Sequence, residues 1–524
     1  MKTIKSIGLA ILVLGVAIFT VSPLLGTYEL DQATFDQYAS SKGLKNELFL
    51  QGMKDHVIGK ELSAVGFATT VASTLEAAND VYKSEQDWNN VFWDNPYKDV
   101  APALMKTSGK GPVAENKLLF FFLTFGLAII GGLMFILPDM VLLGKPGIKN
   151  NHIYQNPVTN RGWVAYIVFG WLVGFYVLLY FYPAFITSWV YPVDPLSMAL
   201  SGNPASQWFL YGTMYTSVML VMGIRMYVKY RHNMYQMVRT TSVLFFQLGF
   251  AFLIPELLVR FNMPYMDFKN AWPLDYDFFF DWNINNLIAS GNVGMFMLGW
   301  GIALTAIIVP VLVYFYGKRW YCSWVCGCGG LAETLGDPYR QHSDKSLKAW
   351  KIERWLIHGV MVFAVIMTAG VLYTYFSGAD QFIGMNTGKV REYYGFLIGS
   401  VFSGVIGTGF YPVMGNRVWC RFGCPLAAYM GLVQKFKSRF RITTNGGQCI
   451  SCGNCSTYCE QGIDVRWYAQ RGQNIVRSSC VGCGVCAAVC PRGVLKLENG
   501  SNDNASRMEA PALIIGNEGI KVEA

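Results

Sequence analysis

Residues 449–459 read CISCGNCSTYC and residues 480–491 read CVGCGVCAAVCP, and these two stretches decide the fold of the C-terminal region. Each is a C-x2-C-x2-C-x3-C run, in which a short loop brings three thiolates to one face of a cubane cluster. In the two-cluster bacterial pattern, the fourth cysteine of each run binds the other cluster. We therefore predict two 4Fe–4S clusters with crossed ligand sets. The first set is Cys449, Cys452, Cys455 and Cys490, and the second is Cys459, Cys480, Cys483 and Cys486.

The spacing of these eight cysteines disfavours two other uses. Within each run they lie too close together to form sensible disulfides, and the membrane topology predicted below places them in a reducing compartment. Pairs of the C-x2-C type bind zinc, but a third cysteine two residues on and a fourth three further are not zinc-ribbon spacing. Pro491 follows the last cysteine as the pattern requires, whereas Glu460 stands where the first run would carry a proline. We expect this departure to affect the turn and not the ligands.

The composition is that of a membrane protein. Of 524 residues, 53% are hydrophobic, 15% aromatic and only 14% charged, so most of the apolar surface is expected on lipid-facing helices. None of the 13 cysteines lies before Cys322, and this clustering indicates metal binding and not a disulfide scaffold. The net charge of +9 comes mainly from Lys and Arg in short loops beside apolar runs, where they orient a membrane protein. We expect no nucleic-acid partner.

The chain contains eight apolar runs, each long enough to cross a hydrocarbon core of ~30 Å as a helix. The first, Ile7 to Leu25, follows MKTIK. Because Pro23 stands where a small-x-small cleavage site would lie, we predict an uncleaved anchor, with a cleaved signal peptide as the alternative. The other seven runs are predicted at 117–143, 163–188, 207–228, 241–261, 292–316, 355–376 and 394–413.

Basic residues in the loops predict the orientation, since Lys and Arg accumulate on the cytoplasmic side of short connections. Alternate loops carry most of these residues. The richer loops hold Lys145, Lys149, Arg161, Lys229, Arg231, Arg239, Lys318, Arg319, Arg340, Lys345, Lys348, Lys351 and Arg354, and the poorer ones hold Lys269, Lys389 and Arg391. The N-terminus and the cysteine runs are therefore expected in the cytoplasm, and residues 27–115 on the periplasmic side of a bacterial inner membrane.

Residues 27–115 form the long polar stretch that precedes the cysteines, and they predict a small, mostly helical domain. Apolar residues recur there at helical spacing, at Phe35, Leu44, Leu48, Met53, Val57, Leu62 and Val65. The aromatic segment DWNNVFWDNPY contains Trp88, Trp93 and Tyr97. Closing a small core is the favoured role of these three side chains, and docking a partner is the alternative.

The other five cysteines form an internal repeat. RWYCSWVCGCGG contains Cys322, Cys326 and Cys328, and RVWCRFGCPLAA contains Cys420 and Cys424. The two segments match at a spacing of 98 residues, in the pairs Arg319 and Arg417, Cys322 and Cys420, and Cys326 and Cys424. The C-x3-C spacing places two thiols one turn apart on one helical face, so packing of the two helix ends would bring four thiolates together.

Three roles remain open for these thiols. Cys322, Cys326, Cys420 and Cys424 suit a redox-active or metal-binding centre, including an iron–sulfur centre, because paired thiolates bind soft metals. Reversible dithiol chemistry is the second role, and packing as small buried hydrophobes is the third. Clustered thiolates need compensating charge, which we expect from the two repeat arginines. Cys328 has no mate in the repeat and is either a spare ligand or without a role.

The repeated C-x3-C segments joined to a C-terminal two-cluster ferredoxin resemble the NapH/NosR/CcoG group of membrane polyferredoxins, over residues 292–495. The first segment has Gly327-Cys328 where proline is usual in that group. No flavin-attachment motif occurs in 27–115, unlike the NosR branch, and no extra domain follows the ferredoxin, unlike the CcoG branch. The resemblance implies an inner-membrane electron-transfer protein that works with the quinone pool or a periplasmic partner, together with other subunits of a respiratory or electron-transfer complex.

Ionisable residues within apolar runs are candidates for function, because placing them in lipid is costly. Glu256 and Arg260 stand one turn apart before an aromatic loop. They are a candidate quinone site, and a plain ion pair at the membrane interface is the favoured alternative. Asp139 is expected at a solvated helix end. Of the five histidines only His358 lies near a span, so no haem is predicted.

These patterns predict an α-helical integral membrane protein of about eight transmembrane helices, with a C-terminal bacterial-type two-cluster ferredoxin domain and a small outward helical domain. The predicted parts are an anchor at 1–26, the periplasmic domain at 27–115, a four-helix membrane region of unrecognised type at 116–291, a membrane region with the repeated motifs at 292–445, the ferredoxin domain at 446–496 and a tail at 497–524. The leading functional hypothesis is electron transfer between the cytoplasmic clusters, the thiolate centre and quinone or an outer partner, with a quinol dehydrogenase activity left open. The alternatives are a metal-reducing assembly factor for a respiratory enzyme and a redox sensor.

Overall fold

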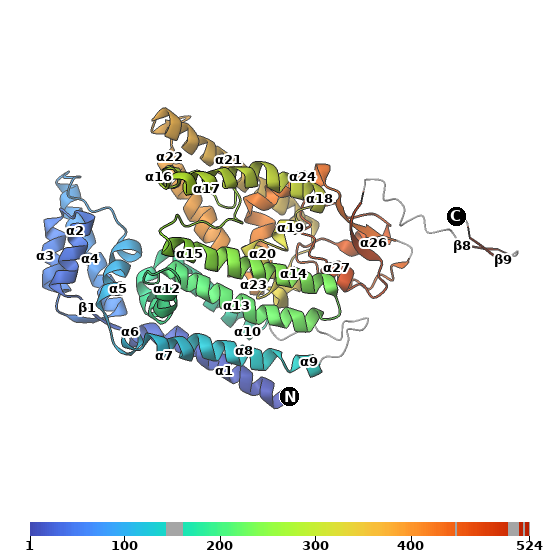
Figure 1. Ribbon diagram of the computed structural model, residues 1–524, viewed down its shortest axis with the longest axis horizontal. Helices are drawn as coiled ribbons and strands as arrows, with labels where there is room; N and C mark the ends of the chain where they lie inside the picture. The colour runs from blue at the N-terminus through green and yellow to red at the C-terminus, as the bar shows by residue number, and fades with distance from the viewer. Residues whose placement is uncertain (143–160, 446–447, 501–512, 517–518, 523–524) are drawn as a thin grey trace. The chain divides into compact units, whose positions relative to one another are not determined.

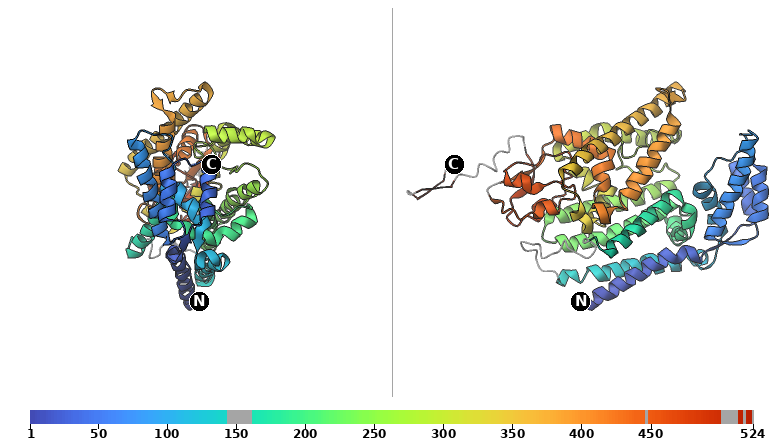
Figure 2. Two further views of the ribbon diagram at one scale, coloured as in Figure 1. Left: turned by 90° about the vertical axis from the view of Figure 1, so that its left-hand side faces the viewer. Right: turned by 180° about the vertical axis from the view of Figure 1, so that it is seen from behind.

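The computed structural model describes residues 1–142, 161–445, 448–500, 513–516 and 519–522. The predicted loop residues Lys145 and Lys149, and most of the predicted tail, lie outside these ranges. The chain divides into two compact units, Met1–Asp139 with Gly174–Val221 and Met140–Val173 with Met222–Ala524. Figure 1 labels the elements in chain order, and Figure 2 gives two further views.

Six helices within the described residues are long and apolar enough to cross a membrane, namely Lys2–Leu25, Lys117–Leu142, Trp163–Phe181, Met234–Arg260, Gly291–Tyr316 and Leu347–Ser377. They coincide with six of the eight predicted runs. The remaining two runs are also helical: 207–228 lies within α13 (Gln207–Tyr230), and 394–413 is covered in part by η11 (Gly395–Ile406), which continues α22 (Thr387–Tyr394). α13 carries Arg225 and Lys229, which make it more polar than the other spans. The prediction of a helical, multi-pass membrane protein is confirmed.

In the first unit, α1 (Lys2–Val21) runs beside α8 (Leu127–Ile136), as Figures 1 and 2 show. α8 continues α7 (Lys117–Phe121) through the π-helical η3 (Phe122–Gly126). Glycines permit the close approach, because a Cβ atom at Gly131 would lie 2.4 Å from the backbone nitrogen of Leu12. Small residues at such crossings are typical of membrane helices. At the far end of the pair, Lys5 Nζ lies 2.6 Å from Asp139 Oδ1, so the helix end that carries Asp139 is held by an ion pair.

Residues 27–115 contain four main helices and a three-stranded antiparallel sheet of order β2-β1-β3. The strands are β1 (Thr27–Glu29), β2 (Glu61–Ser63) and β3 (Gly109–Lys110), and the helices are α2 (Gln32–Lys42), α3 (Glu47–His56), α4 (Ala64–Ser84) and α5 (Ala101–Ser108). Asp31, Asn46 and Ser63 each cap the helix that follows by accepting a hydrogen bond from a backbone N–H. These caps fix where three of the four helices begin.

The core of this domain contains most of the apolar residues that predicted it. Phe35, Met53 and Val57 are fully buried, and Leu44 and Leu62 pack against the same cluster. Leu48 and Val65 were expected in the core but are 44% and 54% exposed. They fall on the outer faces of α3 and α4, whose inner faces are occupied by Phe49 and Phe67.

The tryptophan pair corrects the favoured interpretation of the aromatic segment. Trp88 and Trp93 stack on each other with ring centroids 6.3 Å apart, and their side chains are 56% and 69% exposed. Phe92 and Tyr97 pack against the core instead. The two tryptophans therefore do not close the core, because the chain between them turns Phe92 inward.

Residues 174–221 complete the first unit. After α10 (Trp163–Phe181) the chain passes through η6 (Pro183–Ile186), α11 (Thr187–Val190), η7 (Tyr191–Val193) and α12 (Asp194–Leu200) before it enters α13. Trp189 stacks on Phe19 of α1 at 4.7 Å. Lys117 Nζ lies 2.7 Å from Asp194 Oδ2, so this turn is joined to both long helices of the unit.

The second unit carries all the cysteines. One span consists of α14 (Met234–Phe245), η8 (Phe246–Leu253) and α15 (Ile254–Arg260), and the next, after α16 (Asp281–Ala289), consists of α17 (Gly291–Ala303), η9 (Leu304–Ile308) and α18 (Val309–Tyr316). A third span is the 31-residue α21 (Leu347–Ser377), which is followed by the hairpin of β4 (Gln381–Phe382) and β5 (Met385–Asn386). The elements in and around the two cysteine repeats are α19 (Arg319–Cys322), α20 (Gly327–Glu333), η10 (Asp337–His342), α23 (Tyr411–Met414), η12 (Trp419–Gly423) and α24 (Pro425–Lys437).

The loop of residues 262–280 folds inward between these helices. Trp300 Nε1 of α17 donates to the backbone oxygen of Phe268 at 2.8 Å, and Trp272 Nε1 donates to Thr368 Oγ1 of α21 at 3.0 Å. Trp300 lies nine residues into the span, about 14 Å along the helix at 1.5 Å per residue. The loop thus reaches deep into the bundle, where non-helical backbone is tolerated because protein surrounds it.

The C-terminal region is closed by a strand pair. β6 (Phe440–Thr444) pairs antiparallel with β7 (Leu495–Asn499), from Phe440 opposite Asn499 to Thr444 opposite Leu495. The short helices α25 (Asn454–Thr457), α26 (Val465–Gln470) and α27 (Val485–Ala488) lie between the two strands in sequence. β8 (Leu513–Gly516) and β9 (Gly519–Val522) form a separate antiparallel hairpin.

Candidate iron–sulfur sites

The first predicted ligand set gathers around one cavity. Cys449, Cys452, Cys455 and Cys490 all line it. Burial raises the pKa of the Cys455 thiol to about 12, and the other three thiols of the set act in the same direction. The cysteine from the far end of the second run thus joins three from the first run. A cavity walled by four thiols fits a thiolate-bound cluster.

The second predicted set is also brought together. Burial raises the pKa of the Cys486 thiol, and the nearby thiols of Cys483, Cys480 and Cys459 raise it further. Gly482, between two of these cysteines, has a φ of +60°, and a Cβ atom there would lie 2.5 Å from Cβ of Arg319. The tight loop therefore requires glycine both for its backbone conformation and for its packing.

The two repeated segments share a backbone course as well as a sequence. Gly317 ends α18 with a φ of +65°, and Gly415, 98 residues later, ends α23 with a φ of +94°. Cys326 and Cys424 then occupy equivalent positions, as the extended residues that precede α20 and α24. The two cysteines of each motif are thus separated by a helix break. The prediction that they share one continuous helical face is wrong.

Five thiols converge where the two repeats meet. Cys322, Cys326, Cys420 and Cys424 are buried. Burial raises the pKa of the Cys424 thiol, and the thiols of Cys420, Cys326 and Cys322 raise it further. Cys328, which has no mate in the repeat, forms a hydrogen bond with Cys326 that lowers the pKa of the Cys326 thiol. The site therefore offers five sulfur atoms and not four.

The two repeat arginines have different roles. Arg417 Nη1 lies 3.7 Å from Cys420 Sγ and donates to the backbone oxygen of Cys322 at 3.2 Å. The guanidinium of Arg319 instead lies over the ring of Phe440, 4.8 Å from its centroid. The second positive charge near Cys322 comes from Lys318, whose ammonium lowers the pKa of that thiol against the larger opposing effect of burial. The expectation that Arg319 compensates the thiolates is therefore wrong.

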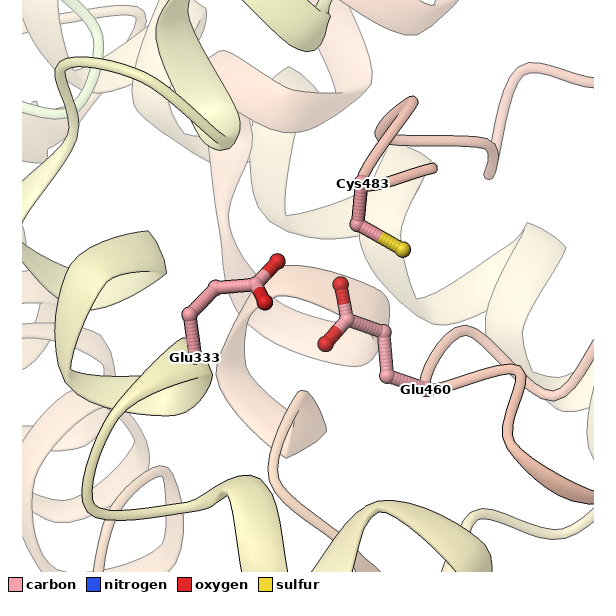
Figure 3. Close-up of side chains that lie close together, drawn as sticks. All are labelled: Glu333, Glu460 and Cys483. Atoms are coloured by element: carbon pink, nitrogen blue, oxygen red, sulfur yellow. The ribbon is translucent and has the colours of Figure 1, made fainter. Parts of the chain in front are cut away.

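A buried ion network lies between the five thiols and the second ligand set, and Figure 3 shows its two glutamates beside Cys483. Glu333 and Glu460 are 3% and 1% exposed, and a carboxylate oxygen of each lies within 4.8 Å of Cys483 Sγ and of the other. The contacts to Glu333 are Arg239 Nη1 at 2.5 Å, Arg340 Nη2 at 2.8 Å and Arg417 Nη2 at 2.5 Å. The contacts to Glu460 are Arg340 Nη1 at 2.9 Å and Arg417 Nη2 at 3.0 Å. Because three guanidinium groups already surround the two carboxylates, this group is better explained as an ion network than as a site for a metal cation.

The network extends to charged residues of neighbouring elements. Arg340 also lies 3.3 Å from Asp337, which in turn pairs with Lys229 at 2.6 Å and Arg225 at 2.7 Å. Removing charges from water is costly unless they are well paired, and in this network five positive groups surround three carboxylates. Glu460 was expected to affect only a local turn, yet its carboxylate belongs to this network. The sequence signal for that role was the missing proline after Cys459.

The second ligand set and the five thiols are linked by hydrogen bonds. Ser323 Oγ donates to the backbone oxygen of Val481 at 2.7 Å. Gln434 accepts from the backbone N–H of Lys318 at 2.7 Å and donates to the backbone oxygen of Cys480 at 2.9 Å. Gln236 donates to the backbone oxygen of Cys483 at 2.8 Å. These contacts reach the loop of Cys480 and Cys483, so the second set lies next to the five thiols.

The candidate quinone residues lie elsewhere. Glu256 and Arg260 are on α15, where Glu256 is half-buried and Arg260 is exposed. The inward-folded loop carries further ionisable groups that sequence reasoning did not single out, with Lys269 Nζ 2.6 Å from Asp267 Oδ2. The ammonium of Lys269 also lowers the pKa of the Cys326 thiol, after the larger effects of its hydrogen bonds and burial. This loop therefore approaches the five thiols more closely than the sequence indicated.

The C-terminal domain holds two crossed cysteine sets, and the membrane region joined to it repeats a cysteine-bearing turn. Together these features define a membrane-bound iron–sulfur protein. A family model described as a 4Fe–4S binding domain matches residues 298–346 and 395–443, which are the two repeats. A second, described as a 4Fe–4S dicluster domain, matches residues 441–491. The resemblance to membrane polyferredoxins is confirmed.

Within that class the chain is similar to several curated proteins. It is 27% identical to the candidate electron transport protein YccM of Escherichia coli (strain K12) over 31% of this chain and 47% of the relative. It is 28% identical to the methylamine utilization ferredoxin-type protein MauN of Paracoccus denitrificans over 31% of this chain and 57% of the relative, and 25% identical to MauN of Methylobacillus flagellatus over 30% and 56%. The chain thus spans about half the length of the curated relatives it matches. No solved structure matches the chain.

Proposed function

We propose that this protein is an iron–sulfur electron-transfer protein that relays electrons between its ferredoxin-type domain and a thiolate centre at the end of the membrane helices. The observation that carries the proposal is the hydrogen bond from Ser323 Oγ to the backbone oxygen of Val481, at 2.7 Å. Ser323 follows Cys322 and Val481 follows Cys480. The two cysteine systems are therefore separated by short stretches of backbone and one hydrogen bond.

The residues assigned to the cofactors follow from the gathered thiols. Cys449, Cys452, Cys455 and Cys490 would hold one 4Fe–4S cluster, and Cys459, Cys480, Cys483 and Cys486 a second. Cys322, Cys326, Cys420 and Cys424 would hold a further metal or iron–sulfur centre, with Cys328 as a fifth sulfur donor beside Cys326. Such centres supply one-electron transfer at potentials that the surrounding charges set.

The protein's own contribution is to place positive charge beside two of these buried thiols, Cys420 and Cys483, against the larger effect of burial, which raises the pKa of both. Arg417 lies against Cys420 at 3.7 Å and Arg340 against Cys483 at 4.0 Å, and both arginines also bind Glu460 and Glu333. Positive charge next to a thiol favours its ionised, metal-binding form. The carboxylates keep the two guanidinium groups in position between the two cysteine systems.

Location and partners are part of the proposal. The protein would lie in a bacterial inner membrane with the ferredoxin domain in the cytoplasm and residues 27–115 in the periplasm, in keeping with the distribution of Lys and Arg. The six predicted parts of the chain, from the anchor at 1–26 to the tail at 497–524, are retained as its domain division. The exchange partner on the membrane side would be quinone, at Glu256 and Arg260, or a periplasmic redox protein.

Iron and sulfide analysis of the purified full-length protein, combined with electron paramagnetic resonance, tests this function. The wild type is expected to show two ferredoxin-type signals. Cys322→Ser and Cys424→Ser are each expected to keep both signals and to lose electron transfer to a quinone analogue or an outer acceptor. Retained transfer in both variants would show that the five thiols are not part of the route.

A further inference from the structure

The two predicted clusters differ in their exposure to solvent. In the first set Cys452 is exposed, and Cys449 and Cys490 are partly exposed. In the second set Cys480 and Cys486 are buried, Cys459 and Cys483 are partly exposed and none is exposed, and that set lies next to the five thiols through the Ser323–Val481 hydrogen bond. The first set is therefore the one that a soluble molecule can approach.

The surface around the first set is basic. Arg466 and Arg492 line the same cavity as its four cysteines. Among residues 448–500, the exposed charged side chains are Arg466, Arg471, Arg492 and Lys496. The acidic residues of this range are less exposed: Glu460 is buried, and Asp464 and Glu498 are partly exposed. Asp464 accepts a hydrogen bond from Ser456 at 2.6 Å.

Apolar groups stand within this basic rim. Ile450, next to Cys449, is 49% exposed, and Trp467, next to Arg466, is 43% exposed. The guanidinium of Arg471 lies 4.1 Å from the centroid of the Trp467 ring and so holds the indole in place. Exposed tryptophan and arginine side chains of this kind are the residues that dominate binding at protein interfaces. A rigid aromatic group among basic residues favours a protein partner over a lipid headgroup.

We propose that the rim formed by Ile450, Arg466, Trp467, Arg471 and Arg492 is the docking surface for a small acidic electron-carrier protein. The inference rests on the proposed function, because it assumes that Cys449, Cys452, Cys455 and Cys490 hold a cluster. One electron passes between the carrier and this cluster, so that one is oxidised as the other is reduced, and no bond is made or broken. The order of sites is then the carrier, the first ligand set, the second ligand set and the five thiols.

Binding of oxidised flavodoxin, an acidic flavoprotein, to the full-length protein in discs of neutral lipid tests the proposal. The double variant Arg466→Glu and Arg492→Glu reverses two charges of the rim. Its affinity for flavodoxin is expected to fall at least about tenfold, since reversed charges at an interface repel a partner of like charge. Binding to the wild type should also weaken between about 0.02 and 0.2 M salt, because screening shortens the reach of exposed charges. Lys437→Glu, an exposed lysine at the end of α24, is the matched control and should bind like the wild type.

Further measurements separate the possible outcomes. Equal flavodoxin binding by the wild type and the double variant, or stronger binding of basic cytochrome c than of flavodoxin, overturns the proposal. So does a double variant that loses affinity only for vesicles of anionic lipid, because the rim would then contact the membrane. Iron content and the rate of reduction by dithionite should be the same in all variants. If the wild type itself lacks iron, the proposed function fails and not merely the docking surface.

Discussion

Ser323 and Val481 are joined by a hydrogen bond of 2.7 Å, and they are only 1% and 2% exposed. The hydroxyl of Ser323 is the donor, and it stands one residue after Cys322. The acceptor belongs to the tight loop between Cys480 and Cys483. This contact ties the ferredoxin-type domain to the end of the membrane helices, and it makes the second ligand set the neighbour of the five thiols.

Ser323→Ala is expected to weaken that junction. The variant leaves the buried backbone oxygen of Val481 without its partner, which costs about 1–3 kcal/mol. The rate at which electrons leave the second ligand set should fall, as measured by freeze-quench electron paramagnetic resonance. Ser290→Ala is the control, because the hydroxyl of Ser290, at the C-cap of α16, donates to the backbone oxygen of Asn286 in that helix at 2.7 Å. Equal rates in the two variants would mean that electrons take another route.

Cys483→Ala and Cys452→Ala are expected to remove different spectroscopic signals. Each substitution takes away a ligand of one set, so the iron content should fall from roughly eight atoms in the ferredoxin domain to roughly four. One signal should remain in each variant, and the remaining signals should differ. Loss of both signals in both variants, with a folded protein by circular dichroism, would show that the cysteines do not form two separate sites.

Glu460→Pro is expected to destabilise the protein, although it restores the residue that the two-cluster pattern usually has after the fourth cysteine. The substitution removes one of the buried carboxylates that pair with Arg340 and Arg417 and leaves Glu333 as their shared partner, and breaking a buried ion pair costs up to about 3–5 kcal/mol. Thermal unfolding in detergent should show a lower midpoint. Glu460→Gln keeps the shape of the side chain and loses only its charge, so its midpoint of thermal unfolding should also be lower than that of the wild type. If Glu460→Pro is as stable as the wild type, the ion network does not support this region.

Reporter fusions at Thr70 and Gln470 are expected to place these residues on opposite sides of the membrane. The loops rich in Lys and Arg predict that residue 70 is periplasmic and residue 470 cytoplasmic. A periplasmic alkaline phosphatase reporter should be active only at Thr70, and a cytoplasmic fluorescent reporter only at Gln470. Activity of one reporter at both sites would mean that the number of membrane crossings between them is even.

The sequence predicted the parts of the fold that depend on local spacing. The apolar runs predicted the spans, and the cysteine spacing grouped the thiols that the structure brings together, because loop geometry limits which cysteines can meet. The exposure of Trp88 and Trp93 was not predictable, since composition does not tell which aromatic residue of a segment turns inward.

The ion network could not be predicted either. Arg340, Arg417, Glu333 and Glu460 come from four separate segments of the chain, and the spacing of charged residues within a segment carries no information about partners from other segments. Arg319 shows the same limit. Its place in the repeat matches that of Arg417, but its surroundings differ, because its guanidinium packs over the ring of Phe440. The inward course of residues 262–280 depends on Trp272 and Trp300, whose hydrogen bonds join segments that sequence patterns treat separately.

The relay is tested most directly by the metal and sulfide content of the full-length protein compared with that of Cys424→Ser. We predict that the wild type binds metal beyond the roughly eight irons of two ferredoxin-type clusters, and that Cys424→Ser loses this excess while both ferredoxin signals remain. An equal metal content in the two proteins, with all five thiols of the repeat freely alkylated in the folded wild type, would contradict it.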